Sequence, residues 1–219
     1  VKVQNTFDSN DWQFGSTSDV FLNGSFITQN TSLLNQWVFL RTYRSNNNGF
    51  GNSLKFDCTT ADTSIAAGEH CILSTRLEGQ DVQRFAKGTS GAKPFMVSFY
   101  VKGNANATYV CELYDGDNNR QISKSFNVTT SWTRVELAFP ADTSGPFGDD
   151  NGLSLYFQIW LHAGTNYTSG TLNSTAWAAA SSSTVRAGGI TSIFDSTNRT
   201  FFLTGIQLET GTVATPFEH

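Results

Sequence analysis

Residues 94–102 read PFMVSFYVK and decide the fold class, because large apolar side chains that suit a strand occupy every second position. The apolar phase of this run holds Phe95, Val97, Phe99 and Val101. Successive side chains of a strand point to opposite faces, so a period of two predicts a β-strand with one face in a core. Residues 153–162, LSLYFQIWLH, repeat the pattern over a longer run.

Similar short runs recur along the chain, separated by turn-forming residues. They are Trp37 to Arg44, Leu54 to Cys58, Cys71 to Glu78, Tyr109 to Asp115, Gln121 to Val128, Trp132 to Phe139 and Phe201 to Glu209. Short strands with turn signals between them predict an all-β fold, a two-sheet antiparallel sandwich of jelly-roll type. One short helix is expected at Gln80 to Lys87, closed by Gly88 as a left-handed cap.

The composition agrees with an all-β chain and excludes two kinds of partner. Of the 219 residues, 38% are apolar, 13% are aromatic and only 15% are charged. A net charge of −4 without long runs of one sign argues against binding duplex nucleic acid, which needs a basic face. No stretch approaches the roughly 20 apolar residues that cross a bilayer, so membrane insertion is not expected.

Two segments do not look like strands. Residues 1–20 are polar with scattered aromatic residues and are interpreted as a tether or docking arm, leaving residues 21–219 as the jelly-roll domain. Residues 163–200, the flap, are rich in Gly, Ser, Thr and Ala but contain Tyr167, Trp177 and Phe194. Such a long loop is expected to fold down over a sheet. The start at Val1 and the stop at His219 suggest a piece excised from something longer.

Residues 153–162 also carry the candidate binding residues. Their non-core phase contains Tyr156, Gln158, Trp160 and His162. Aromatic rings stack on the apolar face of a pyranose, and amides bind its hydroxyls, so this phase predicts a sugar-binding sheet. Tyr100 and Tyr114, on the same phase of their own strands, and Trp177 in the flap are further ligand candidates. The alternative is that these rings are covered by the flap or by a sister subunit.

A weaker candidate is a calcium site in an acidic turn. Asp115, Asp117 and Asn119 place hard oxygen atoms close together, which is the ligand chemistry of calcium. The EF-hand glycine and distal glutamate are missing, and such residues also form ordinary solvated turns. No other cofactor is expected.

Catalysis is not expected. A glycosidase needs two carboxylates across a cleft, and nothing in the sequence places Glu112 opposite Glu136. The three cysteines, Cys58, Cys71 and Cys111, show no zinc spacing. They fit free thiols from a reducing cytoplasm, with a Cys58 to Cys71 bridge as the alternative.

Five segments together resemble a known family. They are residues 57–68 DCTTADTSIAAG, 77–83 LEGQDVQ, 97–102 VSFYVK, 203–209 LTGIQLE and 214–219 ATPFEH. In this order they are similar to a domain that recurs in tailed-phage fibre and other virion proteins, many from marine phages. The resemblance covers about residues 22–219. Residues 22–26, LNGSF, followed by Trp37, also look like the first strand of carbohydrate-binding-module-like jelly rolls.

The resemblance implies a non-enzymatic module of a phage virion, assembled in the bacterial cytoplasm and displayed on a tail fibre. Its implied partners are other virion proteins and a glycan of the host surface. Fibres are typically trimers, so a homotrimer is expected, and the outward aromatic residues would serve a three-fold interface as well as a glycan. The alternatives are a capsid or tail decoration protein without a ligand, and a carbohydrate-binding module of a secreted enzyme.

Overall fold

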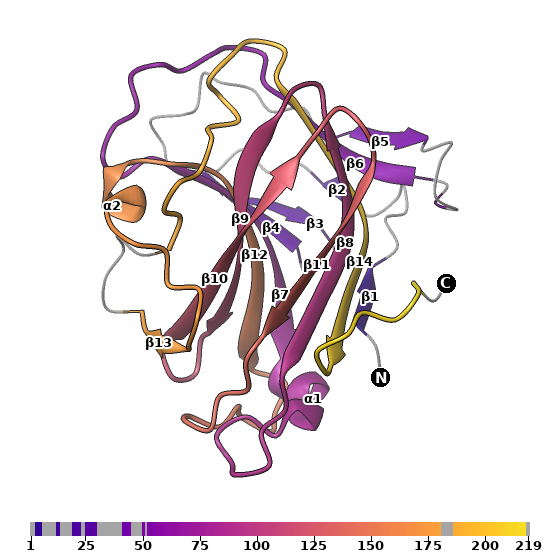
Figure 1. The fold of residues 1–219 in the computed structure, drawn as a ribbon, viewed down its shortest axis with the longest axis vertical. Coiled ribbons are helices and arrows are strands. Elements are labelled where there is room, and N and C mark those ends of the chain that lie inside the picture. Colours follow the sequence, from indigo (N-terminus) through magenta and orange to yellow (C-terminus); the bar gives the residue numbers. More distant parts are fainter. Residues whose placement is uncertain are drawn as a thin grey trace.

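A computed structural model describes residue 50 and residues 52–180 and 186–217, together with the backbone of strands β1 to β5. The chain forms two antiparallel sheets that pack face to face (Figure 1). Between β6 and β12 it changes sheet after β6, β7, β8, β10 and β11, so that most strands have a neighbour in sequence in the other layer, as in a jelly roll. The predicted all-β sandwich is confirmed.

The six-stranded sheet has the order β11-β8-β14-β6-β5, with β1 also paired to β14. Its strands are β1 Val3–Asn5, β5 Arg41–Arg44, β6 Asn52–Asp57, β8 Phe95–Gly103, β11 Thr133–Phe139 and β14 Thr200–Thr210. The eight-stranded sheet has the order β13-β10-β9-β12-β7-β4-β3-β2. Its strands are β2 Trp12–Gln13, β3 Asp19–Leu22, β4 Ser25–Gln29, β7 His70–Glu78, β9 Ala107–Asp115, β10 Arg120–Val128, β12 Leu153–Ala163 and β13 Ala178–Ala179.

The core lies between the sheets and is built from the phases that the sequence predicts. Phe95, Val97, Phe99 and Val101 of β8 are all fully buried there, facing Leu155, Phe157 and Ile159 of β12 in one hydrophobic cluster. Each predicted strand is present with its ends moved by a residue or two, except that residues 37–40 lie outside the described part of the chain. The period-two reading therefore identifies the core faces correctly.

The helix prediction is corrected in length. Helix α1 covers only Gly79–Val82 and continues as a 3-10 turn over Gln83–Phe85, where Ala86 takes the left-handed conformation before Gly88 does. This unit closes one end of the sandwich (Figure 1), and the Phe85 ring stacks on Phe95 with ring centroids 4.0 Å apart. A second one-turn helix, α2 Thr165–Thr168, lies in the flap. No helix in the described part of the chain is long and apolar enough to span a membrane.

Residues 1–20 were expected to contain no strand, and this expectation is wrong, because β1 and β2 lie within them. β1 pairs with β14 and β2 pairs with β3, so pieces of this segment belong to both sheets. The positions of Phe7 and Phe14, two of the scattered aromatic residues of this segment, lie outside the described residues.

All three cysteines are free and buried. Burial raises the pKa of the Cys71 thiol to about 12, which keeps it protonated and unreactive.

Candidate functional site

The outer face of the eight-stranded sheet carries three cross-strand rows, set by the register of β7, β12, β9 and β10. The tyrosine row holds Arg76, Tyr156, Tyr114 and Gln121. The glutamate row holds Ser74, Gln158, Glu112 and Ser123. The tryptophan row holds Ile72, Trp160, Val110 and Ser125. Residues opposite one another in a ladder share a face, so each row is a continuous band across the sheet.

The flap covers the tryptophan row. Trp160 is only 1% exposed and forms a small hydrophobic cluster with Ile72 and Val110 beneath Tyr167 and Ala187 of the flap. The Trp160 and Tyr167 ring centroids are 5.1 Å apart. Figure 1 shows this segment (orange) outside the sheet. The predicted phase of Trp160 is therefore correct, and of the two alternatives for this ring the structure shows cover by the flap, whose residues occupy the space that a ligand would need.

The glutamate row is a buried polar layer centred on Glu112. This carboxylate accepts hydrogen bonds from the Arg186 guanidinium at 2.7 and 2.9 Å and from Trp160 Nε1 at 2.8 Å. Arg186 also donates to Gln158 Oε1 at 3.3 Å. Burial opposes the charge of Arg186, but the neighbouring Glu112 carboxylate raises its pKa overall, so the guanidinium stays charged. The paired charges fasten the flap to the sheet.

Solvent reaches three of the four side chains of the tyrosine row, those of Arg76, Tyr156 and Tyr114, whereas Gln121 is buried. Tyr114 and Tyr156 are half-buried, with ring centroids 5.3 Å apart in an edge-on arrangement. The Arg76 guanidinium lies 5.4 Å from the Tyr156 ring centre, and that of Arg186 lies 5.2 Å from Tyr114. The Tyr114 hydroxyl donates to Asn119 Oδ1 at 3.0 Å. Two rings between two guanidinium groups can take the apolar face and the hydroxyls of a sugar.

His162 is buried at the end of β12 rather than exposed to a ligand. Its Nδ1 lies 2.7 Å from Ser192 Oγ of the flap, and its Nε2 lies 3.8 Å from Glu69 Oε2. Burial lowers the pKa of His162 despite the neighbouring Glu69 carboxylate. His162 therefore joins the flap to the sheet instead of presenting an imidazole to solvent.

Two other predicted ligand residues lie elsewhere. Tyr100 belongs to β8 in the six-stranded sheet, so it is on the opposite side of the sandwich from Tyr156 and cannot extend the same surface. Alternation along a strand indicates the face of its own sheet, not which sheet it joins. Trp177 is buried in the main core, where its Nε1 donates to the Pro140 carbonyl at 2.9 Å. Gln158 lies on the expected face but beneath Arg186.

The acidic turn is organised by nitrogen donors. Asp115 is fully buried, and its carboxylate accepts hydrogen bonds from the backbone N–H groups of Asp117 and Asn118, each at 3.0 Å, and from Lys87 Nζ at 2.5 Å. Asp117 accepts from Gly148 N, and Asn119 adopts a left-handed backbone conformation. Within the described residues, no group of three or more His, Cys, Asp or Glu could hold a metal ion. Calcium stays a prediction that these contacts do not favour.

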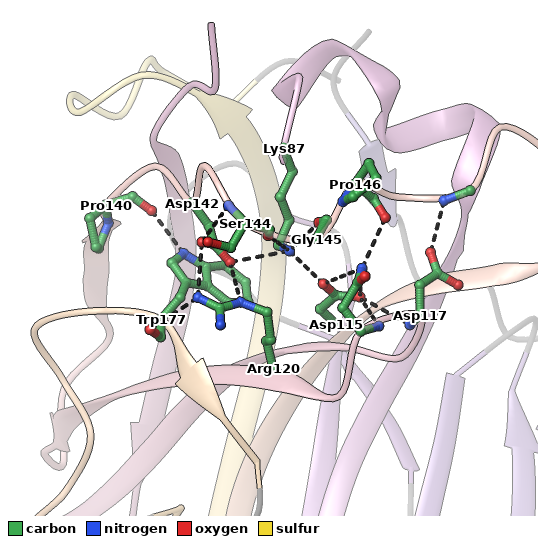
Figure 2. A network of polar contacts seen from close by, with 12 residues as sticks. Lys87, Asp115, Asp117, Arg120, Pro140, Asp142, Ser144, Gly145, Pro146 and Trp177 are labelled. Carbon is green, nitrogen blue, oxygen red and sulfur yellow. Dashed lines mark hydrogen bonds and ion pairs between the residues drawn. The ribbon is translucent and has the colours of Figure 1, made fainter. Parts of the chain in front are cut away.

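Figure 2 shows the network around this turn, which sequence reasoning missed. The Lys87 ammonium also lies 3.2 Å from the Asp142 carboxylate and donates to the carbonyls of Ser144 and Gly145 at 2.9 and 2.6 Å. Arg120 donates to both oxygens of Asp142. Burial works against the Asp142 charge, but the hydrogen bonds from Arg120 and Ser144 and the charge of Lys87 lower its pKa overall.

The two strand carboxylates considered for hydrolysis are far from facing each other. Glu112 lies on the outer face of the eight-stranded sheet, and Glu136 belongs to β11 of the six-stranded sheet. Their register partners, Gln158 and Ser98, place them on opposite sides of the sandwich. They therefore do not form the paired carboxylates of a glycosidase.

No family model and no curated protein sequence matches the chain. Among solved structures, a CBM4 structure is 10% identical, covers 90% of this chain and 90% of its own, and has a TM-score of 0.46. A family 11 carbohydrate-binding module from Clostridium thermocellum, in complex with a β-1,3-1,4-mixed-linked tetrasaccharide, is 12% identical, covers 94% of each chain and has a TM-score of 0.43. The enzymatically active domain of bacteriophage CBA120 tailspike protein 4 is 9% identical, covers 86% of this chain and 19% of its own, and has a TM-score of 0.43.

Proposed function

We propose that this chain is a non-enzymatic, glycan-binding module of a phage tail fibre that contributes to host-surface recognition. The observation that carries glycan binding is the Tyr114–Tyr156 pair between Arg76 and Arg186 on the outer face of the eight-stranded sheet. The phage origin rests on the ordered sequence segments that resemble virion proteins.

The site supplies the two kinds of contact that a sugar needs. Half-buried tyrosine rings offer apolar area to the C–H face of a pyranose, and guanidinium donors bind its hydroxyls. Glu112 holds Arg186 in place through two hydrogen bonds, so the donor is oriented before a ligand arrives. Such preorganisation limits the entropy that is lost on binding.

The test is a glycan array of bacterial lipopolysaccharides and capsules, with Tyr156→Ala and a matched control, Tyr100→Ala. Both residues are half-buried tyrosines on outer faces, but they lie on different sheets. We expect Tyr156→Ala to weaken binding about tenfold, because the stacking surface is lost. Tyr100→Ala should bind as the parent does. Equal binding by both variants would contradict the proposed site.

The same array with and without a chelator tests calcium. Because Lys87 and N–H groups occupy the oxygens of Asp115, we expect binding to persist with the chelator present. Loss of binding on chelation, restored by calcium, would instead place a calcium ion in the functional protein.

The proposed assembly is a homotrimer located in the virion and joined to other virion proteins through residues 1–20. Light scattering measures the oligomer, and deletion of residues 1–20 followed by assembly onto particles measures the docking role. A monomeric mass, or unchanged assembly after the deletion, would contradict these parts of the proposal.

A second candidate is a capsid or tail decoration protein without a ligand. The flap favours it, because it covers Trp160 and so removes one of the predicted stacking rings from solvent. In that case no glycan would bind, and Tyr156→Ala would change the oligomeric mass or the melting temperature. A carbohydrate-binding module of a secreted enzyme is the third candidate, and retardation by plant or algal polysaccharide in an affinity gel would support it.

A further inference from the structure

The opposite outer face, on the six-stranded sheet, carries a row in which basic and aromatic residues alternate. Lys55 of β6 is opposite Phe202 of β14, and Phe202 is opposite Lys102 of β8. Trp132 immediately precedes β11, whose first residue, Thr133, pairs with Val101. We call Lys55, Phe202, Lys102 and Trp132 the lysine row. The backbone register places a further basic residue, Arg41 of β5, opposite Lys55.

The side chains of the lysine row form one contiguous cluster. The ammonium groups of Lys55 and Lys102 lie 5.7 and 5.2 Å from the centre of the Phe202 ring. Lys102 Nζ is also 5.9 Å from the Trp132 ring, and the Trp132 and Phe202 centroids are 6.2 Å apart. Lys55, Lys102 and Trp132 are half-buried, whereas Phe202 is buried beneath them. Solvent therefore meets two ammonium groups and an indole.

Among the described residues, the charge of this cluster is balanced at one of its two lysines. Lys55 pairs with Asp57 at 2.8 Å, but Lys102 forms no ion pair with any residue that the structure describes. Two ammonium groups converge on one ring in a protein whose net charge is −4. Two ammonium groups with one carboxylate partner leave an excess of positive charge over an apolar surface, which attracts an anion.

Packed aromatic residues bound the row on one side. The ring centroids of Phe50 and Tyr100 are 5.2 Å apart, and those of Phe50 and Phe217 are 4.8 Å apart. Arg134 donates to the Thr215 carbonyl, so the C-terminal segment lies against the neighbouring part of this face. The open surface is therefore a band across the strands, about 14 Å long from Trp132 to Lys55 at the usual strand spacing.

We propose that the lysine row binds an acidic polysaccharide, a chain of sugars that bears carboxylate or sulfate groups. The indole offers a stacking surface for a sugar ring, and the ammonium groups pair with its anionic substituents. A band of this length suits an extended polymer better than a single small anion. The site lies on the opposite face from Tyr114 and Tyr156 and does not depend on them.

Affinity gel electrophoresis of the full chain tests this with three polymers: polygalacturonate as the carboxylated probe, heparin as the sulfated probe and dextran as the neutral one. We expect retardation by at least one anionic polymer, none by dextran, and weaker retardation at high ionic strength. The polymer that binds better identifies the anionic group.

Matched variants assign the binding to the row. Lys55→Gln/Lys102→Gln and Trp132→Ala should each weaken the retardation about tenfold. The control is Lys124→Gln, which removes another half-buried lysine that lies 5.9 Å from an aromatic ring, Phe139, outside the row. The control should bind as the parent does. Thermal melting of each variant confirms that it is folded.

Several results would overturn the proposal. They are an absence of retardation by either anionic polymer, equal retardation of the double lysine variant and the parent, an unchanged Trp132→Ala variant, or equally tight binding of single-stranded DNA, which would indicate a non-specific polyanion surface. Tyr156→Ala should leave this binding unchanged, so the lysine row and the tyrosine row can fail separately.

Discussion

The buried ammonium group of Lys87 connects several segments of the chain that are distant in sequence. It is 3% exposed, yet its ammonium group is surrounded by two carboxylates and two backbone carbonyls (Figure 2). The rings of Phe147 and Trp177 lie 5.2 and 5.4 Å away and exclude water. A buried charge is tolerated only when its partners are complete, so this cluster joins the α1 end of the chain to the β9–β10 turn and the 140–146 loop.

We expect Lys87→Met to lower the free energy of unfolding by about 3–5 kcal/mol, because it leaves the Asp115 carboxylate buried without its cation. The matched control, Lys55→Met, removes a half-exposed pair with Asp57 and should cost at most about 1 kcal/mol. Urea unfolding measures both. The double variant Lys87→Met/Asp115→Asn should recover part of the loss. A Lys87→Met variant as stable as the control would show that the buried network does not stabilise the fold.

Gly205 is required by both its backbone and its surroundings. It has φ of +60° at the irregularity of β14 between Thr204 and Gln207, and an added Cβ would overlap the Phe50 ring. Gly189 has a similar φ of +78° but open space around it. Gly189→Ala should therefore cost only the backbone strain, about 1–2 kcal/mol. Gly205→Ala should cost more, because the Phe50 ring must also move. Equal melting temperatures for the two variants would contradict this.

At the scale of single residues, the sequence predicts which face of its sheet a side chain lies on better than it predicts which residues pack against that side chain. The phases of Tyr156, Gln158 and Trp160 follow from alternation, and all three face away from the core as expected. Alternation does not show whether the flap covers them, because it gives only the side of the sheet on which each side chain lies, and Tyr167 and Ala187 of the flap in fact cover Trp160. Lys87 gives no local signal of burial, since its partners come from β9 and from the loop after β11.

At the scale of elements, strands are predictable because each needs only its own alternating pattern. Sheet membership is not, because it depends on which strands pair. Tyr100 and Tyr114 have equivalent phases but belong to different sheets. The predicted helix is shorter than expected, because the chain tightens into a 3-10 turn from Gln83 and Ala86 then takes the left-handed conformation. The flap was foreseeable, because its apolar residues needed a surface to cover.

The contact between the flap and β12 should be sensitive to pH through His162. The groups that face this imidazole are Glu69, Asp62, His70, Ser192 and Phe194. Burial lowers the pKa of His162 below its ordinary value of 6.5, so the unfolded chain binds a proton more readily than the folded one. The contribution of His162 to stability is therefore complete above about pH 6.5 and is lost as the pH falls below it.

We expect the urea concentration at the unfolding midpoint of the parent to decrease as the pH is lowered from neutral to about pH 5. In His162→Gln the midpoint should depend less on pH. The pKa of Asp142 is also lowered, from 3.8, and its contribution is lost only below that value, so the two effects fall in separate pH ranges. Limited proteolysis within the flap reports whether the loss begins there. A His162→Gln variant with the parent's slope would place the titrating group elsewhere.

At the scale of the whole molecule, the sandwich separates two surfaces with different chemistry. The tyrosine row offers rings and guanidinium groups on the eight-stranded sheet, and the lysine row offers ammonium groups and an indole on the six-stranded sheet. The core that lies between them is closely packed with Phe99, Phe157 and their neighbours. The two rows have no residue in common, so a ligand bound at one row does not displace a ligand from the other.

This separation predicts independent binding. Saturation with an acidic polysaccharide should leave the affinity for a neutral host glycan unchanged. For each ligand, the change in binding free energy in the combined variant should equal the sum of the changes in Tyr156→Ala and in Lys55→Gln/Lys102→Gln, within about 0.3–0.5 kcal/mol. Isothermal titration of the parent, both variants and their combination measures the coupling. A larger coupling would mean that the two faces communicate through the sandwich or through an oligomer interface. If a sister subunit covers one face, dilution below the dissociation point of the oligomer should restore binding at that face alone, because the opposite row stays exposed throughout.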